Sequence, residues 1–323
     1  MKLLILIALL ISSLFSLDED FEIKENGRPE KKLKKQSKIL YIQDFTVNYQ
    51  IELVMAESQQ GGHQLGGGVQ GNTAASLAVA IADLDNVALQ KVTDSLYSKY
   101  LNEMKRQGFE IVDLDEIWES KLYTKKREKR WNRKTNEGMY TGGAWGNVVS
   151  KPTGFEFIEP KSKNGFFTNI VLGKTPYELN LTTNIVYLNV SIFKDAESGF
   201  SKFITDLAGT SNIEIETDFR INENSAINFN NLIFFRPEDL NLGGVIEDQE
   251  FESFQTADRD LWGTDYRLGT TRRVWTIYSA ENLEKNNAYI AKCDPKKYVE
   301  GADFGLNIFM DSTLVRIDRY LKD

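Results

Sequence analysis

Histidine and cysteine are nearly absent from this chain of 323 residues, and their scarcity restricts its chemistry. The one histidine, His63, lies in a glycine-rich tract whose flexible backbone is poorly suited to hold a catalytic base. A histidine-dependent triad elsewhere and a multi-histidine metal site are therefore excluded. The one cysteine, Cys293, excludes an intrachain disulfide, and we interpret it as a buried thiol rather than a nucleophile. We expect no catalytic residue, metal or cofactor.

The sequence also lacks the features that recognise nucleic acids and nucleotides. Its 39 Lys and Arg residues stand against 47 Asp and Glu residues, which gives a formal net charge of −8. Such an acidic chain is a poor partner for polyanionic nucleic acid. The segment from Gly61 to Gly71 contains no lysine, and Gly173-Lys174-Thr175 lacks the upstream glycine of a phosphate-binding loop. The overall composition is that of a globular protein, since apolar residues make up 41% of the chain.

The N-terminus has the three parts of a cleaved secretory signal. Lys2 precedes an apolar run from Leu3 to Ile11, and small residues follow before the acidic stretch that begins at Asp18. We expect cleavage after Ser16, so that residues 1–16 are a signal peptide and the mature protein is periplasmic or extracellular. A spanning helix is the alternative, but a bilayer core needs about 20 apolar residues and this run is shorter. An uncleaved segment would make the protein a membrane-tethered structural subunit.

Hydrophobic periodicity predicts an α+β fold that begins with a βαβ-like unit. Residues 17–38 are charged and nearly free of large apolar side chains, so we predict a disordered tether. Residues 39–131 form the predicted α/β unit, because Ile39–Val54 alternates as a strand with one wet face and the region up to Gly108 has helical spacing. The strand Phe109–Val112 follows, and we expect it beside the first strand in one sheet.

The remainder of the chain is predicted to be mainly β. After a second helix from Asp115 to Trp131, residues 132–150 are predicted to form a flexible glycine-rich loop. Residues 151–323 are predicted to be a β-rich region with a C-terminal helix, and the region forms one domain with residues 39–131 or a separate one. The strand candidates are 177–193, 213–219, 227–235 and 273–278. Asp294-Pro295 marks the start of the terminal helix, in which Gly301 and Gly305 lower the helix propensity.

The order of these elements resembles that of a known group of proteins. An early strand bears Tyr41-Ile42-Gln43-Asp44-Phe45, the helix runs from Asn86 to Gln107, and the strand Phe109-Glu110-Ile111-Val112 follows. This arrangement is similar to exported bacterial cell-envelope proteins of uncharacterised function and, more distantly, to the N-terminal fold of the curli-secretion lipoprotein and TolB-like families. It covers about Ile39 to Asp113. The curli-secretion family carries a lipidated cysteine after its signal and this chain has none, so neither pore assembly nor any functional residue is carried over.

Two groups of residues are candidates for ligand binding. Tyr140 and Trp145 lie in the glycine-rich loop, where exposed aromatic rings can stack on sugars or peptides. A basic tract precedes them and can bind anionic envelope polymers or lipid headgroups. Its candidate residues are Lys125, Lys126, Arg127 and Arg130. The plain alternatives are that the aromatics pin the loop to its own core and that the basic residues pair with acids.

The absence of a motif that fixes a reaction favours a non-enzymatic role. We expect an exported cell-envelope protein that binds or helps to assemble another component, either an envelope protein or an anionic envelope polymer, with homo-oligomers and peripheral membrane contact left open. The alternative is a secreted hydrolase that acts on polysaccharide or peptide through paired carboxylates. The carboxylates available for this chemistry are Asp113, Asp115 and Glu116 in one group and Asp258, Asp260 and Asp265 in another.

Overall fold

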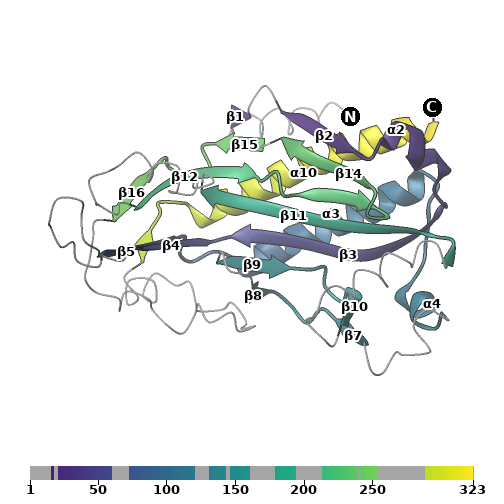
Figure 1. Ribbon diagram of the computed structural model, residues 1–323, viewed down its shortest axis with the longest axis horizontal. Coiled ribbons are helices and arrows are strands. Elements are labelled where there is room, and N and C mark those ends of the chain that lie inside the picture. Colours follow the sequence, from purple (N-terminus) through teal and green to yellow (C-terminus); the bar gives the residue numbers. More distant parts are fainter. Residues whose placement is uncertain are drawn as a thin grey trace, which may run out of the picture.

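The computed structural model describes residues 16–17, 21–59, 73–120, 131–142, 146–160, 179–193, 213–238, 240–253 and 288–322. In this part of the chain the predicted α+β class is confirmed (Figure 1). A large sheet carries two long helices on one of its faces, and one of these is the predicted C-terminal helix.

The large sheet joins both halves of the chain. Within the described residues its strands are β1 (Ser16–Leu17), β2 (Glu22–Asn26), β3 (Ile39–Gln50), β6 (Glu110–Ile111), β8 (Tyr140–Gly142), β9 (Asn147–Ser150), β11 (Thr182–Phe193), β12 (Ile213–Ile221), β13 (Ala226–Phe229), β14 (Ile233–Glu238), β15 (Leu240–Gly243) and β16 (Glu250–Ser253). The longest pairing is parallel, between β3 and β11, and runs from Leu40 opposite Thr182 to Tyr49 opposite Val190. Residues 39–131 and 151–323 therefore contribute to one sheet.

The register of β3 changes at a bulge. Asn184 of β11 lies opposite Ile42 and Ile185 lies opposite Asp44, so Gln43 is an extra residue on β3. The bulge shifts the alternation of side chains by one position, which directs both Ile42 and Phe45 into the core. From Phe45 onward the predicted period of two holds. The strand is shorter than predicted, because it ends at Gln50 and the chain continues after Ile51 as a separate strand.

That next strand belongs to a smaller sheet. It comprises β4 (Glu52–Gln59), β5 (Thr73–Ala80) and β17 (Tyr289–Ile290), in the order β17-β5-β4. β4 and β5 pair antiparallel, with Glu52 opposite Ala80 and Gln59 opposite Thr73. β17 pairs parallel with the end of β5, which brings the segment before the C-terminal helix against the N-terminal half of the chain.

The first long helix, α3 (Asn86–Arg106), confirms the predicted strand–helix–strand unit. It begins after Asp85, whose side chain accepts a hydrogen bond of 3.0 Å from the backbone N–H of Ala88. It ends before Gly108, which has a left-handed φ of 87° that glycine adopts without strain. The chain then enters β6, which pairs parallel with β3 as predicted.

The second long helix, α10 (Pro295–Lys322), passes through both glycines that lowered its predicted propensity. A Cβ atom on Gly301 would lie 2.6 Å from Cγ2 of Val245, and one on Gly305 would lie 2.7 Å from Cδ1 of Leu242. The two glycines therefore let α10 pack closely against the sheet near β15. This close packing compensates for the lower helix propensity of glycine.

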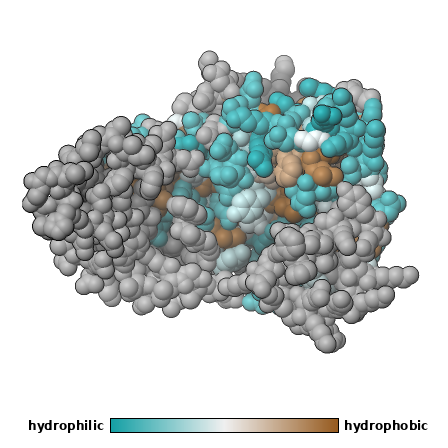
Figure 2. All heavy atoms as spheres, viewed as in Figure 1, coloured by the Kyte–Doolittle hydropathy of each residue, from teal (hydrophilic) through white to brown (hydrophobic). Residues whose placement is uncertain are grey.

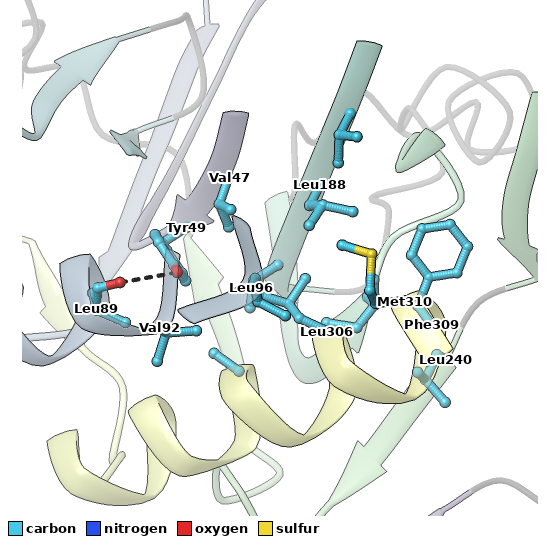
Figure 3. Close-up of a cluster of buried hydrophobic side chains, with 14 of the residues drawn as sticks. Val47, Tyr49, Leu89, Val92, Leu96, Leu188, Leu240, Leu306, Phe309 and Met310 are labelled. Atoms are coloured by element: carbon cyan, nitrogen blue, oxygen red, sulfur yellow. Dashed lines mark hydrogen bonds between the residues drawn. The ribbon is translucent and has the colours of Figure 1, made fainter. Parts of the chain in front are cut away.

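Side chains from the two helices and the core face of the sheet interdigitate (Figure 3). Val47 of β3 and Leu188 of β11 point toward Leu96 of α3 and Leu306 of α10. The Tyr49 hydroxyl donates a hydrogen bond of 3.2 Å to the backbone carbonyl of Leu89. Among the described residues no helix is long and apolar enough to cross a membrane.

The N-terminal segment differs from the predicted tether. Residues 21–38 contain β2, the short helix α2 (Pro29–Lys32) and the 3-10 helix η1 (Leu33–Lys35). β2 pairs antiparallel with β14, and Ile23 and Leu33 are buried in the core. Arg316 of α10 also forms an ion pair of 2.9 Å with Glu25. The prediction of disorder is wrong here, because backbone pairing and a few buried apolar side chains order an otherwise charged segment.

The region around the predicted second helix and loop also requires correction. The helix α4 covers Leu114–Trp118 and has ended by Glu119, while residues 121–130 lie outside the described part of the chain. Trp131 begins a strand, β7 (Trp131–Thr135), which pairs antiparallel with β10 (Glu156–Pro160). Residues 132–150 include β8 and β9 rather than a continuous loop. Both strands extend the large sheet beside β3. Their backbone N–H and C=O groups are paired in the sheet, although the glycine content of the segment predicts an irregular loop.

The four remaining strand predictions have different outcomes. β11 and β12 confirm the predictions at 177–193 and 213–219. The predicted strand 227–235 is a hairpin of β13 and β14, because Asn230 and Asn231 both adopt a left-handed φ of 54° and turn the chain. Asparagine tolerates this conformation better than most residues. The predicted strand 273–278 lies outside the described residues.

The Gly301→Ala, Gly305→Ala double variant tests the close approach of α10. In an isolated helix each substitution would be favourable by about 1 kcal/mol. We expect the double variant instead to lower the free energy of unfolding by about 1–3 kcal/mol, because the new methyl groups overpack the contact with β15. Urea unfolding followed by circular dichroism measures the change. Val315→Ala, at an exposed position of the same helix, is the control, and a double variant as stable as the parent protein would contradict this packing.

Candidate functional site

Of the residues predicted to bind a ligand, the structure places Tyr140. It lies on β8 and is half-buried. Trp145 and the basic residues Lys125, Lys126, Arg127 and Arg130 lie outside the described residues, as do His63, Asp258, Asp260 and Asp265. The predicted grouping of Tyr140 with Trp145 and the basic tract therefore stays a prediction.

Two basic residues next to this tract are paired with acids. Arg133 of β7 contacts Glu156 of β10 at 2.6 Å and Asp115 of α4 at 2.5 Å. Lys134 forms an ion pair with Glu159 across the same ribbon. The hydrogen bonds to Glu156 and then Asp115 raise the pKa of Arg133. Asp115 thus has a structural partner, and Asp113 occupies the N-cap position of α4.

The face of the large sheet opposite α3 and α10 is more distinctive. Figure 1 looks onto this face, with both helices behind the sheet. Figure 2 shows that the described residues on it are mostly hydrophilic, with a smaller hydrophobic area among them. We name its central part the polar face. It consists of Asp44, Thr46, Asn48, Gln50, Tyr140, Lys151, Tyr187, Asn189 and Ser191.

Lys151 organises one end of the polar face. Its side chain is 8% exposed and forms an ion pair with Asp44. The ammonium group also donates a hydrogen bond of 2.6 Å to Oγ1 of Thr46, which in turn donates one of 2.9 Å to Asp44. The Phe157 ring lies with its centroid 5.0 Å from Nζ, within the range of a cation–π contact. The positive charge is therefore neutralised within the protein.

Amide side chains form the middle of the polar face. Asn48 and Asn189 lie opposite each other on the paired strands, and Nδ2 of Asn48 donates a hydrogen bond of 3.1 Å to Oδ1 of Asn189. In the next row Ser191 donates a hydrogen bond of 2.7 Å to Oε1 of Gln50. Asn48 and Ser191 are themselves buried, so the half-buried Asn189 and Gln50 are the more accessible amides of these rows.

Two tyrosines flank the amides. Tyr187 is 42% exposed, and Tyr140 is half-buried on β8. Burial is the main reason that the pKa of Tyr140 is raised, and the negative charge of Asp44 adds to the effect. Burial also raises the pKa of Tyr187, while a hydrogen bond with Asn48 opposes the rise. Both phenols are thus held in the neutral form, in which they present a ring and a hydroxyl.

Most of this site is absent from the sequence-based prediction. The alternating pattern of β3 places Asp44, Thr46, Asn48 and Gln50 on one face of the strand. The sequence analysis predicts that this face is solvent-exposed and gives it no binding role. The signal available in the sequence is that this face carries amides and hydroxyls where an exposed strand usually carries lysine or glutamate. Tyr187 and Asn189 join this face only because β11 pairs with β3, and the sequence pattern does not reveal that pairing.

Other chemistry finds less support in the described residues. Burial, and then the charge of Asp294, raises the pKa of the Cys293 thiol to about 12, so the reactive thiolate is disfavoured. No group of three or more His, Cys, Asp or Glu side chains in the part of the chain that the structure describes could hold a metal ion. Comparisons of the chain with protein-family models, with curated proteins and with solved structures give no match.

A double-mutant cycle tests whether Lys151 organises the polar face. We expect Lys151→Met to lower the free energy of unfolding by about 1–3 kcal/mol, because it leaves the partly solvated Asp44 without its partner. The Asp44→Asn, Lys151→Met double variant should cost at least about 0.5 kcal/mol less than the sum of the single variants. Urea unfolding of the four proteins gives the coupling. Strictly additive effects would show that the pair does not interact energetically.

Between the two long helices, Asp303 is a half-buried carboxyl whose ionisation opposes folding. It faces α3, where Nζ of Lys99 lies 2.6 Å from Asp311 and 2.8 Å from Oδ1 of Asn307. Burial raises the pKa of Asp303 despite the charge of Lys99 and a hydrogen bond of 2.9 Å from Asn307. The folded state consequently binds this proton more tightly than the unfolded state. The stability that the protonated carboxyl contributes is fully present below the pKa that Asp303 has in the unfolded chain. It is lost as the pH rises through the higher pKa of Asp303 in the folded protein.

Asp303→Asn removes this titration while retaining an oxygen acceptor for Asn307. We expect the variant to melt at a higher temperature than the parent protein at pH 7, and the difference to vanish below about pH 4, where the parent carboxyl is protonated in both states. Thermal melts from about pH 3 to pH 8 measure this dependence. Asp311→Asn, which removes the surface partner of Lys99, should give no such gain. An unchanged or lower melting temperature for Asp303→Asn at pH 7 would refute the assignment.

Proposed function

We propose that this protein is an exported component of a bacterial cell envelope that binds another envelope component through its polar face. Export is supported by the charged, apolar and small-residue parts of residues 1–16 and by the resemblance of the first strand, helix and strand to envelope proteins. Binding is supported by one observation above all. The sheet is covered on one face by α3 and α10, while the opposite face carries amides and hydroxyls, some of them buried, around an exposed Tyr187.

The composition of the polar face favours recognition. Tyrosine gives a large amphipathic contact area for little loss of side-chain entropy, and asparagine and serine offer adaptable hydrogen bonds. These are the residue types at positions 187, 189 and 191 on β11.

The alternative hydrolase is less well supported. Its chemistry needs two carboxylates about 5–10 Å apart with room for a substrate between them. On the polar face, Asp44 is the carboxylate, and it is tied to Lys151 and Thr46. Asp115 is tied to Arg133. The oxygens of both carboxylates are therefore engaged by neighbouring cationic side chains rather than directed at a substrate.

Site-specific photo-crosslinking in native envelopes tests the proposed function. Tyr187 is replaced by the photoreactive residue p-benzoylphenylalanine, and Val315 is replaced in a matched control. Val315 is 62% exposed and lies on α10, on the other side of the sheet. We expect a discrete crosslinked product at position 187 that is absent or much weaker at position 315, with mass spectrometry identifying the attached component.

The same preparation tests export. The proposal requires that the N-terminal residue of the purified protein lies near Leu17 and that the protein fractionates with the envelope or the medium. Retention of Met1 in a cytosolic fraction, or equal crosslinking from positions 187 and 315, would refute the proposed role.

A further inference from the structure

We infer that the polar face binds a neutral, hydroxyl-rich glycan chain. This inference rests on the proposed function and specifies the class of ligand that the face accepts. It is carried by three features of the described residues, which are the charge balance of the face, its unfilled hydrogen-bonding capacity and its exposed aromatic ring.

Among the described residues, the charge balance disfavours a polyanion as the ligand. The charged groups of the polar face are Lys151 and Asp44, which neutralise each other. Nearby Arg133 and Lys134 are already paired with acids. The whole chain has a formal net charge of −8. An anionic polymer would therefore find no uncompensated positive charge among these residues and would approach an acidic protein.

Two amide side chains near Tyr187 each have one buried polar atom without a hydrogen-bond partner in the described structure. Nδ2 of Asn189 is buried and has no hydrogen-bond partner in the described structure. Oδ1 of Asn228 is likewise without a partner, and this residue is 7% exposed. Asn228 lies opposite Ile185, and Asn189 is two residues beyond Tyr187, so a donor and an acceptor lie on either side of Tyr187 on the same face.

Leaving such groups unpaired costs about 1–3 kcal/mol each, so a ligand that satisfies them gains affinity. A sugar hydroxyl both donates and accepts a hydrogen bond. Asn228 lies opposite Ile185, which is four residues before Asn189 on β11, so the two amides are about 13 Å apart along the strand and would be served by hydroxyls on different rings of one glycan chain. A hydroxyl-rich chain therefore complements this donor and acceptor pair better than a ligand that carries acceptors alone, such as a polyphosphate.

The exposed ring of Tyr187 supplies the apolar contact. One face of a sugar ring presents C–H groups, and an aromatic side chain that is part solvated can pack against them while its hydroxyl stays hydrated. A peptide strand would instead use an exposed sheet edge, where main-chain hydrogen bonds provide the affinity. Tyr187 lies on β11, which is paired on both sides with β3, β12 and β13, so its backbone offers no such edge.

Calorimetric titration of the purified full-length mature chain tests the inference. The probes are neutral hexasaccharides of β-1,4-glucose, β-1,3-glucose, α-1,4-glucose and β-1,4-N-acetylglucosamine, with dextran sulfate and polyglutamate as anionic probes. We expect at least one neutral hexasaccharide to bind and both anionic probes to bind more weakly. Tyr187→Ala and Asn189→Ala should each weaken binding by about tenfold or more.

Tyr289→Ala is the matched control, because Tyr289 is 54% exposed and lies on β17 of the smaller sheet. It should leave the affinity unchanged. The midpoints of urea unfolding establish that each variant is folded. If either Tyr187→Ala or Asn189→Ala fails to fold, the other variant still tests the inference.

The outcomes separate this inference from the proposed function. If no neutral hexasaccharide binds while position 187 still crosslinks to a protein or an anionic polymer, the glycan inference is overturned and the proposed function stands. If neither titration nor crosslinking detects a partner, both fail. Hexasaccharide binding that is insensitive to both Tyr187→Ala and Asn189→Ala would also overturn the inference, because the glycan would then bind elsewhere.

Discussion

The parallel pairing of β3 with β11 is the contact on which the rest of the structure depends. It joins strands whose facing residues Asn48 and Asn189 are 141 positions apart in the sequence. One side of the pair provides the core residues that α3 and α10 cover, and the other side provides the polar face. Closing so long a loop has an entropic cost that the burial of apolar surface on the core side must offset. Folding and the candidate site therefore depend on the same pair of strands.

Two local irregularities make this arrangement work. The bulge at Gln43 changes which side chains face the core, so that the strand can bury Ile42 and still present Asp44 to Lys151 on the opposite face. The glycines of α10 let a helix of ordinary width approach β15 closely. Both features reduce local stability in isolation and are stabilised by the tertiary contacts around them.

The sequence predicts the strongly periodic elements well. The spacing of Leu89 and Leu96 within α3, the stop at Gly108 and the proline that begins α10 were all readable, because each follows from backbone geometry within a few residues. The ordered segment 21–38 was missed because Ile23 and Leu33 are isolated apolar residues in a charged stretch. Their burial depends on β14 and α10, which lie far away in the sequence. The polar face was missed for the same reason, since period two assigns Asn48 to a face and does not reveal Asn189 beside it.

The central claim is that Tyr187 of the polar face is exposed in the isolated protein and covered by an envelope component in the native setting. Hydroxyl-radical footprinting of tyrosines, in purified protein and in native envelopes, tests this most directly. Tyr49, Tyr100 and Tyr298 are fully buried and should be unreactive in both samples, and the exposed Tyr289 provides an internal reference. The account predicts that Tyr187 is modified in the purified protein and protected in the envelope while Tyr289 stays reactive. Equal modification of Tyr187 in both samples would contradict it.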